Sequence, residues 1–132
     1  MESKKEITKN LLANSFKKLI LDIPFKNITI KMITDKSKVI RPTFYHHFKD
    51  KYEVLEYIVD EDIMKNIYEM VDSDMEYESL KIIFIRLEKN REFIKKASKV
   101  EGQNSFKEIL GYKIYNIFIR NIYFFVNTLH HD

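Results

Sequence analysis

Glycine and proline, the residues that turn a chain most sharply, are rare in this sequence. The 132 residues include two glycines and two prolines. A β-rich fold needs such residues at many tight turns, whereas a helical fold needs them only at a few helix ends. Apolar residues make up 45% of the chain and aromatic residues 14%, which is enough to build a core. We therefore predict an all-α fold.

Apolar residues also recur at helical spacing along most of the chain. The first predicted helix ends before Pro24, because the residue ahead of a proline avoids the helical conformation. Two short helices follow, joined by a turn at "KSKV", and three longer helices complete the chain. Thr29 is expected to cap the second helix, and Asp50 with Glu53 to form a capping box for the fourth. The predicted helices are residues 4–21, 30–36, 40–48, 51–72, 78–96 and 105–129.

Each predicted helix carries an apolar face that we expect to point into the core. The long helix at 51–72 is expected to join a head to a body rigidly, and the last helix to be buried on most of its circumference. The expected inward residues are Ile7, Leu11, Leu12, Phe16, Leu19 and Ile20; Ile33, Ile40, Phe44 and Phe48; Val54, Leu55, Ile58, Ile63, Ile67 and Met70; and Leu80, Phe84, Leu87 and Phe93.

Charge is distributed unevenly along the chain. Residues 1–51 hold 12 Lys and Arg against 5 Asp and Glu, a balance of +7. Residues 52–132 hold 11 against 15, a balance of −4. This pattern is typical of a polyanion-binding head on an acidic body, although a chance distribution of surface charge would look the same. We predict a head domain at 1–51 and a helical ligand-binding or dimerisation domain at 52–132.

Several classes of function lack the residues that they need. There is no cysteine, no glycine-rich phosphate loop and no evident nucleophile with a base, so we expect neither an enzyme nor a cofactor. His46 and His47 are adjacent and cannot easily share an ion, and His130 and His131 lie at a terminus, so no metal site is expected. The first ten residues lack an apolar signal core, and 114–126 is too short and polar to span a bilayer. A cytoplasmic protein is expected.

The stretch "VIRPTFYHHFKDK" indicates a surface that binds DNA. Two short helices joined by a tight turn describe a helix-turn-helix. On a helical wheel Phe44, Phe48 and Ile40 point inward, whereas Pro42, Tyr45, His46 and Lys49 point outward with Arg41 beside them. Proline costs little in a first helical turn, where the backbone N–H has no partner within the helix. The alternative is a helix-turn-helix fold that never contacts DNA, with Tyr45 and His46 covering a core edge.

Arg41 can donate two hydrogen bonds to guanine or a phosphate, and Pro42 can contact a thymine methyl group. Hydroxyl and ammonium groups nearby can bind phosphates, which would fix the position of the helix. The complete set of candidate DNA-binding residues is Thr29, Lys31, Lys38, Arg41, Pro42, Thr43, Tyr45, His46, His47, Lys49 and Lys51.

Residues 7–58 resemble the N-terminal domain of TetR-family transcriptional regulators. The matching features are a first helix that ends before "PF", the "ITI" entry to the second helix, and "V-x-R-x-TFY-x-HF-x-DK". The resemblance implies a homodimer that places two recognition helices in successive major grooves of a palindromic double-stranded operator. It implies phosphate contacts from Thr29, Tyr45, His47 and Lys51, and base or groove contacts near Lys31, Arg41, Pro42 and Thr43.

One position departs from the family pattern. Ile40 stands where a small polar residue usually caps the recognition helix, so Ser37 or the turn backbone is expected to provide the cap.

The body resembles a TetR-like subgroup that includes activators of dihydroxyacetone-kinase operons. The residues that carry this resemblance are "N-x-x-F" and "GQNSF" within 90–106. Family members are usually longer and dimerise through their last two helices, so the body is expected to be shortened. Ile117, Ile119 and Phe124 are the expected dimer face. Such an activator meets a protein co-regulator through its body, and the alternative to a DNA regulator is a helical module that works only through protein contact.

Aromatic residues of the body offer a second kind of site. Family members often bind a small-molecule effector between body helices, and ordinary core packing is the alternative reading of the same residues. The expected pocket residues are Tyr68, Phe84, Phe93, Tyr112, Tyr115 and Phe118.

Overall fold

The computed structural model describes residues 2–102 and 104–130, and every regular element in these ranges is helical. This confirms the all-α prediction. In chain order the elements are α1 (Lys4–Asp22), the 3₁₀ turn η1 (Phe25–Asn27), α2 (Ile30–Ser37), α3 (Arg41–His47), α4 (Lys51–Val59), the π-helical turn η2 (Asp60–Met64), α5 (Ile67–Asp72), α6 (Glu76–Lys89), α7 (Arg91–Ala97) and α8 (Phe106–His130).

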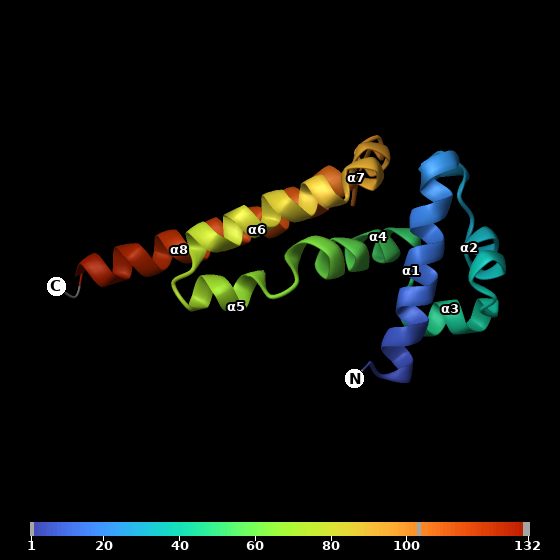
Figure 1. The fold of residues 1–132 in the computed structure, drawn as a ribbon, viewed down its shortest axis with the longest axis horizontal. Coiled ribbons are helices and arrows are strands. Elements are labelled where there is room, and N and C mark those ends of the chain that lie inside the picture. Colours follow the sequence, from blue (N-terminus) through green and yellow to red (C-terminus); the bar gives the residue numbers. More distant parts are fainter. Residues whose placement is uncertain (1, 103, 131–132) are drawn as a thin grey trace.

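The molecule is elongated, with α1, α2 and α3 gathered at one end (Figure 1). We call these three helices the head and the elements from α4 to α8 the body. α1 stands between the two parts, because it packs on α2 and α3 on one side and on α4 and α7 on the other. The far end of α8 extends beyond α5 and α6 (Figure 1). The head therefore presents α2 and α3 on the side that faces away from the body.

A single apolar core runs from the head into the body. Leu12 and Phe16 of α1 are fully buried with Ile33 of α2 and Phe44 of α3. The same core continues through α4 and η2 into α5, where Ile67 is fully buried. Lys17 also forms an ion pair with Asp62, at 2.8 Å between Nζ and Oδ2, across the boundary. The head is thus fixed to the body by packing and by charge.

The helix predicted over 51–72 is interrupted, and that prediction was wrong. α4 runs into the π-helical η2, and Asn66 then adopts a left-handed conformation with φ of 67° before α5 begins. Arg86 of α6 donates hydrogen bonds from Nη1 to the carbonyl oxygens of Ile63, at 2.8 Å, and Lys65, at 2.7 Å. The apolar periodicity of 51–72 does not reveal this break. The carbonyl oxygens of Ile63 and Lys65 at the break are satisfied by Arg86, which is more than 20 residues away in the sequence.

The helix predicted over 78–96 is also divided. α6 ends at Lys89, and the side chain of Asn90 donates to the Arg86 carbonyl oxygen at 2.8 Å. α7 begins directly after Asn90 and buries Phe93, whose ring meets Phe106 edge-on at 6.1 Å between centroids. Ser105 caps α8 by accepting the Glu108 N–H at 3.2 Å. Asn90 of the "N-x-x-F" run therefore ends α6, and Phe93 packs α7 against Phe106 of α8. Ser105 of "NSF" caps the start of α8.

Four residues expected to face the core are exposed instead. Ile7 and Leu11 lie at the edge of the stripe that α1 buries through Leu12, Phe16 and Ile20. Ile40 is 69% exposed, because it precedes α3 and does not follow the periodicity of that helix. Phe84 is also 69% exposed, since Ile83 occupies the core position of α6. The sequence predicted which segments are helical better than it predicted how each helix is rotated.

The last helix has two different long faces. Phe106 and Ile117 lie in the core, and on the same side Lys113 forms an ion pair with Asp60 and Arg120 with Asp72, both at 2.8 Å. At 100° per residue the opposite side carries an exposed apolar stripe. We call this stripe the α8 stripe; its residues are Tyr112, Tyr115, Ile122, Val126 and Leu129. None of the helices in the described ranges has the length and apolarity needed to cross a membrane.

Candidate nucleic-acid interface

α2 begins with a complete capping arrangement at Thr29. The Thr29 hydroxyl accepts the Met32 N–H at 3.1 Å, and the Thr29 N–H donates to the Met32 sulfur at 3.4 Å. The predicted cap is therefore confirmed, with a methionine where a glutamate or glutamine would usually complete the box. Capping satisfies some of the free N–H groups at this end and fixes where α2 starts, with Thr29 and Lys31 exposed.

The turn between α2 and α3 depends on Lys38. This residue adopts a left-handed conformation with φ of 59°, and the Val39 N–H then donates to the Thr34 carbonyl oxygen at 3.1 Å. Glycine usually occupies such a position at a helix end. Ser37 donates its hydroxyl to Thr34 O at 3.2 Å, so it does not cap α3.

α3 starts without a side-chain cap. The Ile40 side chain makes no capping hydrogen bond, and only its carbonyl oxygen accepts, from the N–H groups of Thr43 and Phe44. These are the first hydrogen bonds of the helix itself, and the described hydrogen bonds include no substitute cap for α3 from Ser37 or from the turn before Ile40. Pro42 lies in the first turn of the helix, where its missing N–H costs little.

Phe44 and Phe48 anchor α3 to the core. Phe44 is fully buried and Phe48 is almost so, and their rings lie 5.7 Å apart. Phe48 also packs against Tyr57 of α4 at 5.6 Å between centroids. The turn after α3 is held by Asp50, which caps α4 by accepting the Glu53 N–H, and by the Glu53 carboxylate, which accepts the Lys49 N–H at 2.8 Å instead of the Asp50 N–H of the predicted capping box. One side of α3 is therefore immobilised and the other side is free.

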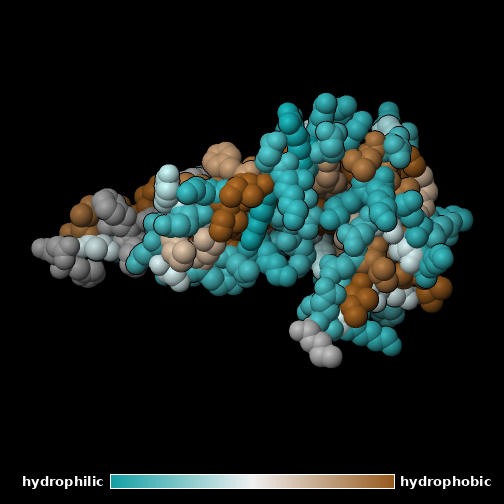
Figure 2. Space-filling model, in the orientation of Figure 1, coloured by the Kyte–Doolittle hydropathy of each residue, from teal (hydrophilic) through white to brown (hydrophobic). Residues whose placement is uncertain are grey.

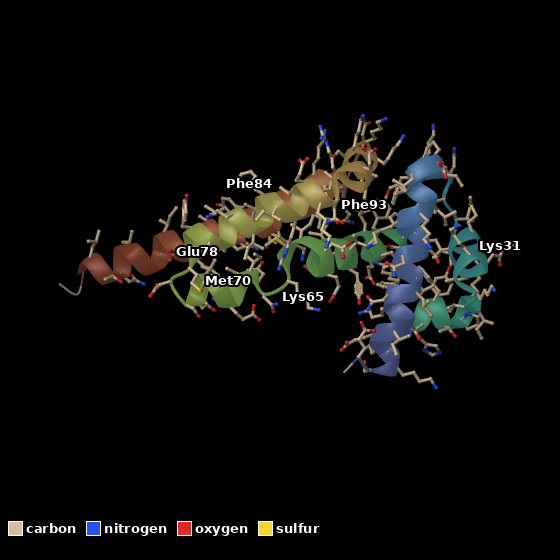
Figure 3. All side chains as sticks on the ribbon, viewed as in Figure 1. Lys31, Lys65, Met70, Glu78, Phe84 and Phe93 are labelled. Carbon is tan, nitrogen blue, oxygen red and sulfur yellow. The ribbon has the colours of Figure 1, made fainter. Side chains whose placement is uncertain are left out.

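Most of the predicted contact residues lie on this free surface. Figure 3 shows Lys31 on the side of α2 that faces away from the body. Arg41 lies 5.9 Å from the Tyr45 ring centroid, and Lys31 is paired with Asp35 at 2.7 Å. The exposed residues of the set are Thr29, Lys31, Lys38, Arg41, Pro42, Tyr45, His46 and Lys49, whereas Thr43, His47 and Lys51 are half-buried.

His47 is held in an environment that opposes its protonation. Burial lowers the pKa of His47, and the positive charges of Lys9, Lys5 and His46 lower it further. Its Nδ1 atom is buried and has no hydrogen-bond partner among the described residues. His47 is therefore neutral near pH 7 in the free protein.

Lys51 points into the protein rather than outward. Its ammonium donates to the carbonyl oxygens of Phe25, at 2.6 Å, and Ile28, at 3.0 Å, and lies 4.3 Å from the Phe25 ring centroid. Burial lowers its pKa. Because Phe25 and Ile28 lead directly to Thr29, Lys51 fixes the backbone at the start of α2.

Two lysines of α1 lie beside this surface although the sequence analysis did not select them. Lys9 lies over the rings of Phe48 and Tyr57, at 5.4 and 4.8 Å from their centroids. Lys5 and Lys9 both act on the pKa of His47, which places their charges close to α3. Their spacing of four residues puts them on one face of α1, and this spacing was the available signal.

The aromatic residues proposed for an effector pocket differ widely in burial among those whose side chains the structure describes. Phe93 is buried in the core, Tyr68 is half-buried, and Phe84, Tyr112 and Tyr115 are exposed. The side chain of Phe118 lies outside the described part of the structure. Within the described residues no group of three or more His, Asp or Glu side chains could hold a metal ion; His131 and the side chain of His130 fall outside that part.

A capped helix, a tight turn and a second helix with one anchored and one cationic face define a helix-turn-helix protein. Residues 17–58 match the sequence model described as "Bacterial regulatory proteins, tetR family". This region is therefore similar to the tetR family, and it covers the end of α1, all of α2 and α3, and the greater part of α4.

A similar curated protein supports the same assignment. The chain is 28% identical over 90 residues to a protein named "HTH-type dhaKLM operon transcriptional activator DhaS" from Lactococcus lactis subsp. lactis (strain IL1403). The aligned region covers 68% of this chain and 48% of the relative, so the chain spans about half the length of the curated relative that it matches. The relative is of the kind that the "GQNSF" region resembles.

Proposed function

We propose that the protein is a DNA-binding transcriptional regulator that acts as a homodimer on a palindromic operator. The observation that carries this proposal is the free surface of α3. The opposite side of α3 is anchored in the core by Phe44 and Phe48. No acidic residue occurs between Asp35 and Asp50 in the sequence. A cationic helix face without carboxylates fits the major groove, where negative phosphates flank the base edges. The proposal places the protein in the cytoplasm with its operator.

The exposed side chains divide into two roles. Arg41 and Pro42 lie in the first turn of α3, the part of a recognition helix that reaches base edges. Thr29, Tyr45 and Lys49 lie around it and can donate to phosphates on either side of the groove. His47, with Lys5 and Lys9 nearby, offers a further phosphate contact at the edge of the head.

The dimer would form through the α8 stripe. Large apolar side chains such as Ile122, Leu129 and Tyr115 remain between 57% and 59% exposed there. Exposed apolar side chains gathered along one face of a helix mark an association surface. This stripe replaces the dimer face expected from the sequence. Of the three residues expected there, Ile117 lies in the core, Ile119 is half-buried and the side chain of Phe124 is outside the described part.

The test of DNA reading is Arg41→Ala in an operator-binding assay at two salt concentrations. We expect loss of about 1–3 kcal/mol of binding free energy and a relaxed base preference, because a bidentate contact to guanine would be lost. Lys36→Ala is the control, since Lys36 is exposed on α2 but is not among the predicted contacts. Unchanged binding by Arg41→Ala at both salt concentrations would show that α3 is not the recognition helix.

A second candidate is a module whose body binds a protein partner instead of a small effector. The exposed Tyr77, Phe84 and Ile85 on α6 favour this alternative. Figure 2 shows apolar side chains on the visible surface of the body, and Figure 3 shows Phe84 pointing outward. A heparin-column retention that is lost in Arg41→Ala would favour DNA reading over a role in protein contact alone.

A further inference from the structure

A cavity of about 670 Å³ lies where the head meets the body. The end of α1, the turn η1, the start of α4 and the segment after α7 form its walls. Its apolar wall includes Ile20, Ile23, Phe25, Tyr52 and Val100. The volume is within the range of small-molecule sites, which are mostly apolar with a few polar groups. Of the aromatic residues proposed for an effector pocket, the five whose side chains the structure describes do not line this cavity.

Four lysines line the same cavity. Lys26 comes from η1, Lys51 from α4, and Lys96 and Lys99 from α7 and the segment after it. Among the described residues, none of the four has a carboxylate within 4.0 Å. Among the described residues of the cavity wall, the acidic side chains are those of Asp22 and Glu101. The cavity thus joins an apolar wall to an excess of unpaired positive charge.

Lys51 connects this cavity to the DNA-facing surface. Its ammonium uses two donors on the Phe25 and Ile28 carbonyl oxygens, which leaves a third donor. Because burial lowers the pKa of Lys51, a nearby anion would stabilise its charged form. An anion that draws the ammonium toward the cavity would weaken its hold on the backbone that leads to Thr29.

We propose that the cavity between head and body binds a small organic anion with an apolar part, such as an aromatic carboxylate, and that binding alters the start of α2 through Lys51. The lysines hold the carboxylate, and the apolar wall holds the ring. This ligand is an effector of the proposed DNA regulator, so the last step of the inference rests on the proposed function. The binding of the anion in the cavity does not depend on the proposed function.

The ligand assay uses 4-(trifluoromethyl)benzoate, followed by ¹⁹F NMR, with the purified full chain and no DNA. The matched neutral probe is 4-(trifluoromethyl)benzamide, which keeps the apolar ring and removes the charge. The test variant is Lys96→Gln with Lys99→Gln. The control is Lys95→Gln with Lys107→Gln, two exposed lysines outside the cavity that give the same change in net charge. Far-UV circular dichroism establishes that each variant is folded.

We expect saturable binding of the benzoate, at least fivefold weaker binding of the benzamide, and a loss of at least fivefold in the test variant but not in the control. Equal affinity for both probes, or equal losses in the two variants, would overturn the site. A second arm measures operator binding with and without saturating benzoate. If the benzoate binds but the protein never binds DNA, the proposed function fails and the site stands. If DNA binds with equal affinity in both conditions, the link through Lys51 is wrong.

Discussion

Lys51 and His47 are half-buried ionisable residues in the predicted contact set, and each has a pKa lowered by burial. Lys51 was assigned to a phosphate contact from its charge and from the family resemblance, and His47 from the resemblance alone. The environment of Lys51 could not be predicted from the sequence, because its ammonium donates hydrogen bonds to the carbonyl oxygens of residues 26 and 23 positions earlier in the chain. Sequence spacing does not reveal a contact of this range.

Replacing Lys51 by methionine is expected to lower the free energy of unfolding by about 1–3 kcal/mol, because the Phe25 and Ile28 carbonyl oxygens lose a charged donor. Urea denaturation measures the change. Lys49→Met is the control, since Lys49 is exposed and its side chain has no hydrogen bond among the described residues. A Lys51 variant as stable as the Lys49 variant would contradict the positioning role.

Stability is expected to fall at mildly acidic pH through His47. Its pKa is lowered in the folded protein, so the unfolded chain binds the proton more readily. The contribution is complete above the unfolded pKa of about 6.5 and is lost as the pH falls through the folded pKa. Urea midpoints between pH 8 and pH 5 measure the effect, which His47→Gln should reduce. His46→Gln is the matched control, and an identical pH profile for wild type and His47→Gln would refute the prediction.

At the scale of elements, the caps predicted at Thr29 and from Asp50 to Glu53 are present because local sequence determines them. The interruption at η2 and the division at Asn90 were not predictable from periodicity. A helical pattern continues through both places, and the compensating contacts come from Arg86 on another element or from a single side chain. The start of a helix could therefore be predicted from neighbouring residues, whereas an interruption within a helix depended on contacts with distant residues.

The uncapped start of α3 leads to a prediction for that helix. Ile40→Ser should raise the free energy of unfolding by about 1 kcal/mol, because a serine hydroxyl can accept an N–H that the isoleucine side chain cannot. Ile40→Ala separates this gain from the effect of removing an exposed apolar side chain, and both are compared by urea denaturation. Equal stability of the serine and alanine variants would show that the turn backbone already satisfies this end of α3.

For the whole molecule, the helix-turn-helix and the exposed face of α3 were predictable, because both depend on the α2–turn–α3 pattern. The rotation of α8 was not. Its sequence is apolar on most sides, and the packed face is the one that buries Phe106 and Ile117 and pairs Lys113 and Arg120 with Asp60 and Asp72. The packing of α8 thus determines which apolar residues remain available to a second copy.

Ile122→Glu combined with Val126→Glu is expected to convert the proposed dimer into a monomer, because association would bury two unpaired carboxylates. Light scattering measures the mass in solution. Asn127→Glu is the control, since this residue lies on the other side of α8 at 100° per residue. A dimer that persists in the double variant would exclude the α8 stripe as the interface.

The interrupted connection at η2 affects how a dimer would fit an operator. α4 has nine residues, a length of about 13 Å, and beyond it the path depends on the two hydrogen bonds from Arg86. In a dimer, the separation of the two recognition helices would depend on this short segment and the Arg86 guanidinium group, together with the packing of α1 on α4 and α7, instead of on one continuous helix. We expect such a regulator to tolerate an added base pair between half-sites, and Arg86 to set how large that tolerance is.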